Sequence, residues 1–259
     1  GPQHLETFKT IENVRKTKLE LVDSLPKEGI AFINYEDENI KQSQIEKKHI
    51  TFGLSKECNY YADEITLSEM GANFIVHTPK GRKIEVKTKL LGKHNITNIT
   101  GAIAVCDTLG LTQEAIQAGV RFLKPVPHRL ELKKYENGNI IIDDAYNSNH
   151  KGAQMALEVL KNFQNRTRVL VTPGMVDLGE EAEKYNKEFG MQAAEAADYI
   201  ILVGEKQAKP IKEGNLEKGY QEENLYVAKN LNEAITKMNE IAKENSVILL
   251  ENDLPDNYL

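Results

Sequence analysis

Residues 139–152, NIIIDDAYNSNHKG, contain a predicted strand, a loop and a helix start, in that order. The β-branched run 140–142 indicates a buried strand, and Asp143 and Asp144 follow it directly. Apolar residues at helical spacing begin at Ala153. In open α/β sheets ligands bind at the carboxyl ends of strands, where such loops lie. Carboxylates there can bind ribose hydroxyls or a metal, and a helix N-terminus can bind an anion, so the stretch predicts a ligand site.

The same residues also suit a structural role. Asp-Asp-x-x-Asn before a helix is common capping and turn chemistry, because short polar side chains satisfy backbone N–H groups there. This stretch alone leaves both interpretations open, and the choice depends on the motifs that surround it.

Downstream of this stretch, strand and helix patterns alternate. Strands are predicted at 168–172, 199–203, 224–227 and 246–250, and helices at 180–197, 206–213 and 231–244. A further strand is expected before the turn at 136–139. This alternation predicts an α/β fold whose second part is a doubly wound, mostly parallel, Rossmann-like domain.

The first half of the chain combines an α/β pattern with a run of strands. A helix is predicted at 11–24 and a buried strand at 29–34. Strand-like segments separated by polar turns fill 49–91 and indicate an antiparallel β-layer. Helices follow Gly92 and Thr112. We therefore expect part of an α/β domain with an attached antiparallel layer.

The domain boundary is predicted at a short stiff linker that carries Pro125 and Pro127. It gives two domains, 1–126 and 127–259. The net charge of −6 gives no general electrostatic case for binding nucleic acid. No apolar run is long enough to span a bilayer. The two cysteines lack metal-binding spacing and favour a reduced, cytoplasmic protein.

Two more motifs accompany DDAYNSN, namely LLGKHNITN at 90–98 and PVPHRLEL at 125–132. These three, in this order, resemble the Mur ligases, which build the peptide of bacterial cell-wall precursors. The resemblance implies the latter part of a central ATP-binding domain and a complete C-terminal domain. HLETF near the start, PGMVDLGE at 173–180 and the form DDAYNSN are similar to the member that adds D-alanyl-D-alanine to a UDP-N-acetylmuramoyl tripeptide.

The resemblance also implies a reaction and its residues. ATP would phosphorylate a substrate carboxylate to an acyl phosphate, which the amine of D-alanyl-D-alanine would attack in peptidoglycan precursor synthesis. The implied residues are His4 and a carbamylated Lys18 for Mg²⁺, His94, Asn95 and Asn98 for adenine, Arg129 for the phosphates, Asp144 for the ribose, and Tyr146, Asn147 and Asn149 for the amine side. Lys18 and Arg129 would be the catalytic residues, because they stabilise charge.

Each of these residues also has an ordinary interpretation. His4 suits a solvated terminus and Lys18 an exposed helix position, while Asn95 suits a helix N-cap. The segment 173–180 lacks the spacing of a phosphate-binding glycine loop and is expected to shape the amine side. The ending ENDLPDNYL differs from the lysine-glycine-serine-arginine ending of other members, so contacts made by that ending are not transferred.

The sequence contains no G-x-x-x-x-G-K-[ST] phosphate-binding loop, which such a ligase needs. We therefore expect a C-terminal portion of the ligase, inactive alone, with the missing N-terminal half as a partner. Two alternatives stay open: a Mur-type ligase with another amine substrate, and a non-catalytic module that pairs with a separate P-loop chain. A nicotinamide-binding domain is disfavoured because no G-x-G-x-x-G follows a predicted strand.

Overall fold

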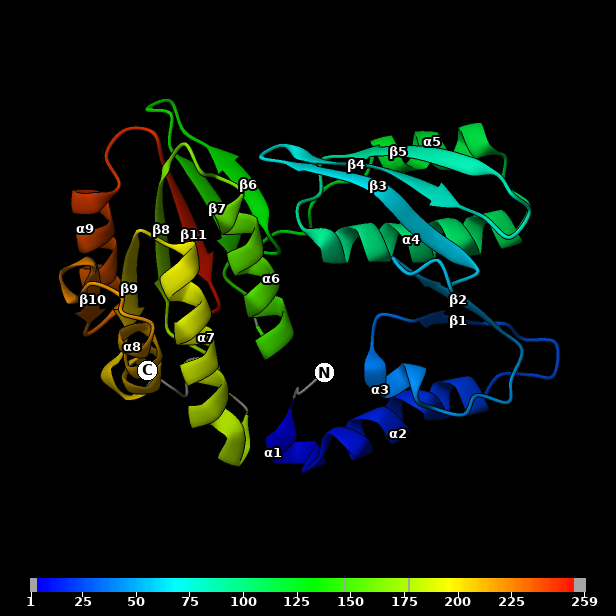
Figure 1. The fold of residues 1–259 in the computed structure, drawn as a ribbon, viewed down its shortest axis with the longest axis horizontal. Coiled ribbons are helices and arrows are strands. Elements are labelled where there is room, and N and C mark those ends of the chain that lie inside the picture. The colour runs from blue at the N-terminus through cyan, green and yellow to red at the C-terminus, as the bar shows by residue number, and fades with distance from the viewer. Residues whose placement is uncertain (1–3, 147, 177, 254–259) are drawn as a thin grey trace. The chain divides into compact units, whose positions relative to one another are not determined.

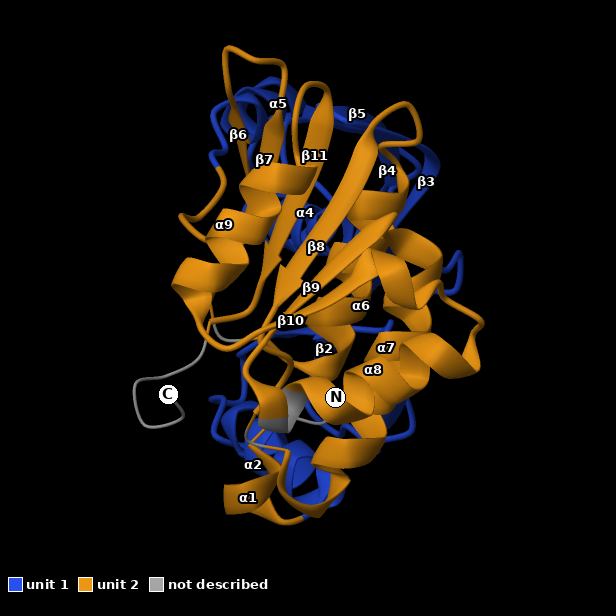
Figure 2. Cartoon of the chain, turned by 90° about the vertical axis from the view of Figure 1, so that its left-hand side faces the viewer, with its two compact units in different colours: residues 1, 10–124 blue, residues 2–9, 125–259 orange. Residues whose placement is uncertain are grey.

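The computed structural model describes residues 4–146, 148–176 and 178–253. The chain forms two compact units, and it passes between them twice (Figure 2). Among the described residues, unit 1 contains Thr10–Lys124, and unit 2 contains 4–9 together with those from Pro125 onward. The boundary predicted between 126 and 127 stays a prediction. None of the described helices is long and apolar enough to cross a membrane.

Unit 1 is built on a five-stranded sheet with the order β1-β2-β3-β4-β5 (Figure 1). Its elements are α2 (Ile11–Asp23), β1 (Ala31–Asn34), α3 (Glu38–Lys41), β2 (His49–Gly53), β3 (Tyr60–Ser68), β4 (Gly71–His77), β5 (Lys83–Thr88), α4 (Lys93–Thr108) and α5 (Gln113–Arg121). Strands β3, β4 and β5 are antiparallel, as the sequence predicts. Strand β2 is parallel to both β1 and β3, so its assignment to the antiparallel layer was wrong. The connections 35–48 and 54–59 each return the chain to the same end of the sheet, so β1, β2 and β3 run in one direction.

The core of unit 1 lies between this sheet and helices α4 and α5. Ile96, Ile99 and Ile103 of α4 pack with buried residues of β3, β4 and β5. Gly101 faces the ring of Phe52, and a Cβ there would lie 2.7 Å from the Phe52 Cε2 atom. Helix α2, all of whose residues are described, buries none of them. Its predicted apolar side therefore stays outside the core.

Unit 2 is built on a six-stranded sheet with the order β10-β9-β8-β11-β7-β6. Its elements are α1 (Leu5–Phe8), β6 (Glu131–Lys134), β7 (Ile140–Asp144), α6 (His150–Lys161), β8 (Thr167–Thr172), η1 (Gly179–Glu181), α7 (Ala182–Ala196), β9 (Tyr199–Val203), α8 (Glu205–Glu217), η2 (Glu222–Asn224), β10 (Leu225–Ala228), α9 (Leu231–Ile241) and β11 (Ser246–Glu251). All strand pairs are parallel except β6–β7.

Helices cover both faces of this sheet, α9 on one face and α6, α7 and α8 on the other (Figure 2). The α/β class and the doubly wound, mostly parallel second part are therefore confirmed. The last strand, β11, lies between β7 and β8, and this is where the strand order reverses. In such sheets the carboxyl ends of the strands at the reversal form the ligand-binding crevice. This edge carries Asp144, Thr172 and Glu251, the last residues of their strands.

Candidate functional site

The two aspartates that end β7 have different environments. Asp143 is buried, and its carboxylate accepts hydrogen bonds from Lys133 Nζ at 2.6 Å and His128 Nδ1 at 2.9 Å. The backbone N–H of Ala145 donates to its other oxygen. Burial by itself would raise the pKa of Asp143, but these hydrogen bonds and the Lys133 charge lower it below its ordinary value. Asp143 therefore serves the structure, because it holds β6 and the preceding loop to β7.

Asp144, the last residue of β7, is only partly buried. Its Oδ1 accepts the backbone N–H of Leu130 at 3.0 Å. Burial raises the pKa of Asp144 to about 6, although the Leu130 hydrogen bond and the nearby Arg129 charge oppose the shift. His128 and Leu130 both have left-handed backbone conformations, with φ values of 59° and 48°. Such conformations are unfavourable for residues with side chains and often occur at functional sites.

Arg129 and Tyr146 lie on the same side of this edge. The Arg129 Cζ atom is 4.4 Å from the centroid of the Tyr146 ring, which is a cation–π geometry. Tyr146 is half exposed, so the pair lies at the surface. The structure thus brings together Arg129, Asp144 and Tyr146, three residues that the sequence proposes. A guanidinium, a carboxylate and a phenol suit a ligand that carries phosphate, hydroxyl and ring groups.

Asn149 forms the N-cap of α6. Its Oδ1 accepts the backbone N–H of Gly152 at 2.9 Å, so its side chain stabilises the helix start. Its predicted role beside the amine stays a prediction. Asn147, which we also predict on the amine side, lies outside the described residues. His150 follows the cap, and its ring lies 4.6 Å from that of Tyr185. Burial lowers the pKa of His150.

Sequence reasoning missed Asn252, which connects the loops at this edge. Its Nδ2 donates to the Gly174 carbonyl at 2.5 Å, and its Oδ1 accepts the Ser148 N–H at 3.0 Å. Its own backbone N–H donates to the Asp144 carbonyl at 3.2 Å. One asparagine therefore fixes the loops after β7 and β8 against the end of β11. The signal was available, because a Glu-Asn pair directly follows the apolar run 247–250.

The loop after β8 has a second clamp. Buried Asn186 accepts the Met175 N–H at 2.9 Å and donates to the Met175 carbonyl at 2.9 Å. Gly174 has a φ of 82°, which allows the chain to turn away from the sheet. Gly174 and Met175 are thus held from two sides, by Asn252 and Asn186. This rigidity suits a loop that shapes a binding site, as we predict for 173–180.

The predicted adenine residues of unit 1 lie in the first turns of α4. His94 is mostly buried, burial lowers its pKa, and its Nδ1 has no hydrogen-bond partner among the described residues. Asn95 donates its Nδ2 to the Leu91 carbonyl at 2.8 Å, which anchors the side chain. Asn98 is exposed one turn later. Positions 94, 95 and 98 lie close together on a helix, so these three side chains are neighbours.

The two predicted magnesium residues belong to different units. Lys18 is exposed on α2 of unit 1, and His4 precedes α1 in unit 2 with a φ of 52°. Within the described ranges, no group of three His, Cys, Asp or Glu side chains is arranged to hold a metal ion. The described side chains of these types therefore provide no preformed cage, and Mg²⁺ would depend on water and phosphate oxygens, which it readily accepts.

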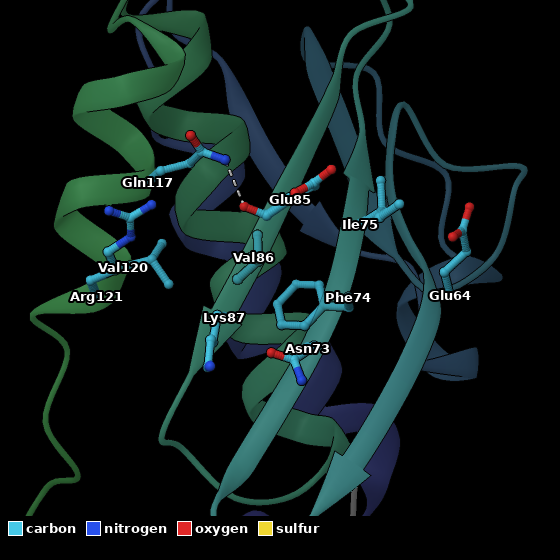
Figure 3. A pocket seen from close by; sticks show the side chains of 10 residues that line it. All are labelled: Glu64, Asn73, Phe74, Ile75, Glu85, Val86, Lys87, Gln117, Val120 and Arg121. Carbon is cyan, nitrogen blue, oxygen red and sulfur yellow. Dashed lines mark hydrogen bonds between the residues drawn. The ribbon is translucent and has the colours of Figure 1, made fainter.

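Unit 1 also contains a cavity of about 360 Å³ beside α5 (Figure 3). Phe74, Val86 and Val120 give it an apolar lining, and Lys87 and Arg121 add positive charge. The side chain of Gln117, which also lines it, donates to the Glu85 carbonyl at 2.9 Å. None of the residues predicted for the site lines this cavity. The buried polar atoms without partners, among the described residues, also lie elsewhere.

Comparison with known proteins gives the family. Residues 1–106 match the Mur ligase middle domain, and residues 128–251 match the Mur ligase glutamate ligase domain. The UDP-N-acetylmuramoyl-tripeptide–D-alanyl-D-alanine ligase of Escherichia coli (strain K12) is 34% identical over 207 residues. This match covers 78% of the chain and 45% of the E. coli protein. The chain spans about half the length of the curated relatives it matches.

Solved structures agree with this assignment. A crystal structure of MurF from Acinetobacter baumannii matches with a TM-score of 0.84 and 26% identity, over 98% of this chain and 55% of that one. MurF ligase from Thermotoga maritima in complex with ADP matches with a TM-score of 0.83 over 98% of this chain and 56% of that one. Its identity is 22%, so this second likeness concerns the fold alone. The chain therefore belongs to the Mur ligase family, of which it contains a middle domain and a C-terminal domain of MurF-like sequence.

Proposed function

We propose that the protein to which this chain belongs is an ATP-dependent amide ligase that adds D-alanyl-D-alanine to a UDP-N-acetylmuramoyl tripeptide. The observation that carries the proposal is the grouping of Arg129, Asp144 and Tyr146 at the strand reversal of unit 2. The E. coli relative bears the name of this activity. The sequence form DDAYNSN also favours this amine substrate over others.

The residues of unit 2 fit a nucleotide. Asp144 has one oxygen bound to the Leu130 N–H, and a carboxylate has further lone pairs that can accept ribose hydroxyls. Arg129 offers planar donors and a permanent charge for phosphate oxygens. We propose that these two residues bind the ribose and the phosphates of ATP. The ADP-bound Thermotoga maritima structure has the same fold, which is compatible with this proposal.

Unit 1 offers groups that suit a purine base. The Nδ1 of partly buried His94 has no partner among the described residues, although buried ring nitrogens normally have a hydrogen bond. The Oδ1 of anchored Asn95 and the exposed amide of Asn98 supply both acceptors and donors. We propose that these three residues contact adenine. Asn95 also stabilises the start of α4, so its structural role accompanies the binding role.

In the proposed reaction, ATP converts the tripeptide carboxylate to an acyl phosphate, and the amine then displaces phosphate. Arg129 would stabilise the charge that develops on the transferred phosphoryl group. A magnesium ion would neutralise phosphate charge, and we propose His4 and a carbamylated Lys18 as its protein ligands. Tyr146, Asn147 and Asn149 are proposed for the amine side. That the chain alone does not turn over stays a prediction.

Calorimetric titration of the 259-residue chain with ATP and Mg²⁺ tests the nucleotide site. We expect weak binding that is lost in Asp144→Ala and retained in Glu158→Ala. Glu158 is an exposed residue of α6, so its variant controls for the loss of one carboxylate in the same unit. Equal binding by all three proteins, or absence of binding by the unaltered chain, would contradict the assignment of Asp144.

A second assay addresses the amine. The chain is incubated with the UDP-N-acetylmuramoyl tripeptide, ATP and a panel that contains D-alanyl-D-alanine, L-alanine and D-glutamate. We expect no product from the chain alone, and D-alanyl-D-alanine as the preferred amine once a P-loop-bearing N-terminal portion is supplied. Preference for another amine would refute the substrate assignment without affecting the nucleotide site.

A further inference from the structure

Three side chains form a row across the carboxyl ends of β8, β11 and β7. In the parallel registers, Glu251 pairs with Asp144, while Leu250 pairs with Val171, which places Thr172 on the other side of Glu251. Neighbouring strands are about 4.8 Å apart, and residues in register point to the same face of a sheet. Thr172, Glu251 and Asp144 therefore lie side by side on the face that α6 covers.

Glu251 is completely buried, yet its carboxyl group is only half satisfied. Its Oε2 accepts the Thr172 hydroxyl at 2.6 Å, and the same hydroxyl accepts the Gly174 N–H at 3.0 Å. Its Oε1 is buried and has no hydrogen-bond partner among the described residues. Fully buried carboxylates are normally paired with a cation. Here the facing ionisable group is a second acid, Asp144.

The charged groups around the pair decide how it ionises. Arg129, which precedes β6, favours the charged form of Asp144, and Asp143 on β7 opposes it. Glu251 faces Asp144 and the hydroxyls of Thr172 and Ser148. His150, the first residue of α6, belongs to the helix over this face, and its Nε2 lies 3.6 Å from Glu188 Oε2 of α7. Arg129, the cation that acts on the Asp144–Glu251 pair, therefore acts on Asp144.

Two neighbouring carboxylates, one of them fully buried, cannot both ionise without a large electrostatic penalty. Arg129 stabilises charge on Asp144, so the proton resides mainly on Glu251. Burial and the charge of Asp144 act together to raise the pKa of Glu251 to about 7, against the hydroxyls of Thr172 and Ser148. With the pKa of Asp144 raised to about 6 and that of Glu251 to about 7, the two acids hold a single proton between those values, where isolated carboxyls are already ionised.

We propose that Glu251 is a positioning residue of the nucleotide site, which shares one proton with Asp144 across the β7–β11 strand pair and so keeps the charge of this edge at one. The inference rests on the proposed nucleotide site at Asp144. Neutral Glu251 leaves Asp144 as the single anion of the two, within the field of the Arg129 charge. Ionised Glu251 would add a second negative charge beside Asp144 and repel the phosphates of a nucleotide.

The shared proton is tested without any ligand. Carbon-13 carboxyl NMR of glutamate-labelled chain, with Glu251→Gln to assign the resonance, gives the titration midpoint of Glu251. We expect a midpoint near 7, and one lower by about 1 unit in Asp144→Asn, because that variant removes the neighbouring charge. A midpoint near about 4.3, or one that Asp144→Asn leaves unchanged, would overturn the shared proton.

The positioning role is tested by the pH dependence of ATP-Mg binding. We expect the ATP affinity of the unaltered chain to fall by up to about tenfold above neutral pH, where Glu251 ionises. A tenfold change in affinity corresponds to a difference of one unit between the pKa of Glu251 in the ATP-bound chain and in the free chain. Glu251→Gln, permanently neutral, should bind without that alkaline decrease, whereas Glu158→Gln on exposed α6 should retain it. An unchanged decrease in Glu251→Gln refutes the role of Glu251 and leaves the nucleotide site intact. Absence of binding by the unaltered chain at every pH refutes the nucleotide site, and the positioning role with it.

Discussion

Asp143 and Asp144 are adjacent in the chain, but their pKa values are shifted in opposite directions. Hydrogen bonds from Lys133, Ala145 and His128 outweigh burial at Asp143 and lower its pKa. Burial dominates at Asp144 and raises its pKa to about 6. Because side chains alternate along a strand, the two carboxylates face opposite sides of the sheet. The pair in DDAYNSN therefore divides into one structural acid and one acid of the proposed site.

The first prediction concerns Asp143→Asn. A lowered pKa means that Asp143 stabilises the fold above its ordinary pKa and that this contribution is lost as the pH falls through the folded-state value. At neutral pH the variant leaves Lys133 without its closest acceptor, so we expect a loss of about 1–3 kcal/mol in the free energy of unfolding. Urea unfolding measures it, with Asp253→Asn at an exposed position as the control. Equal midpoints for both variants would contradict the structural role.

The second prediction concerns the stability of Glu251→Gln. A carboxyl whose folded-state pKa is raised binds more protons when folded, so stability is greatest below its ordinary pKa and falls as the pH rises through about 7. The unaltered chain should therefore lose on the order of 3 kcal/mol between pH 4.5 and pH 8 from this group, at about 1.36 kcal/mol per unit. Glu251→Gln should lack that decrease, and Glu158→Gln should show it. Parallel pH profiles for Glu251→Gln and the unaltered chain would refute this prediction.

The sequence predicted the strands of unit 2 closely because its apolar runs are short, β-branched and separated by amphipathic helices. The run 246–250 and the observed β11 (Ser246–Glu251) differ by one residue. The position of β11 between β7 and β8 could not be predicted, because strand order depends on contacts between residues about 80 to 110 positions apart. Glu251 and Asn252 acquire their roles from that position, so sequence reasoning treated the ending as an unexplained polar tail.

In unit 1 it is the direction of a strand that could not be predicted from the sequence. The segment 49–53 alternates like any exposed strand, and its side-chain pattern does not distinguish parallel from antiparallel pairing. The connection 35–48 decides the direction, and its short helix α3 (Glu38–Lys41) was not predicted. In contrast, the strand end and polar loop at 140–149 predict a ligand site by general chemistry, and the family resemblance then assigns Asp144 to it. Residue types and their spacing can be interpreted from the sequence, whereas strand order decides which distant residues contact them.

The third prediction concerns Asn252. Asn252→Ala removes the side-chain hydrogen bonds to Gly174 and Ser148, so the loops after β7 and β8 should exchange amide hydrogens faster. Nucleotide affinity should fall with them, because the ligand must then order these loops. Asn245→Ala is the matched control, since Asn245 has a φ of 56° and Asn252 one of 63°. Both variants share the strain of alanine in a left-handed conformation. Asn245→Ala also loses a side-chain hydrogen bond, from its Nδ2 to the Asn165 carbonyl, so a difference near Ser148 and Gly174 reports the contacts that Asn252 makes there.

The comparison of Asn252→Ala with Asn245→Ala can also contradict the role of Asn252. If Asn245→Ala and Asn252→Ala give the same hydrogen exchange in the segments around Ser148 and Gly174, the connecting role of Asn252 is wrong. Hydrogen exchange resolved by peptide mass spectrometry distinguishes these segments from the rest of unit 2.

The last prediction concerns the packing of α7 against α8. A Cβ at Gly190 would overlap the backbone carbonyl of Ile211, and one at Gly214 would overlap that of Lys187. Backbone atoms cannot move aside as a flexible side chain can, so each Gly→Ala substitution should separate the helices and reduce stability by about 1–3 kcal/mol or more. Gly119→Ala in α5 is the control, because a Cβ there meets no atom within 4 Å and alanine favours the helix by about 0.5–1 kcal/mol.

Gly→Ala should therefore lower the free energy of unfolding at Gly190 and Gly214 and raise it at Gly119. Urea unfolding followed by circular dichroism measures both, and a neutral or stabilising Gly190→Ala would show that the two helices are less closely packed than the structure indicates. The contact also bears on the site, because α7 carries Asn186, which holds Met175 in the loop after β8. A separated α7 should therefore weaken nucleotide binding in Gly190→Ala as well, whereas Gly119→Ala, in unit 1, should leave the loop clamp unchanged.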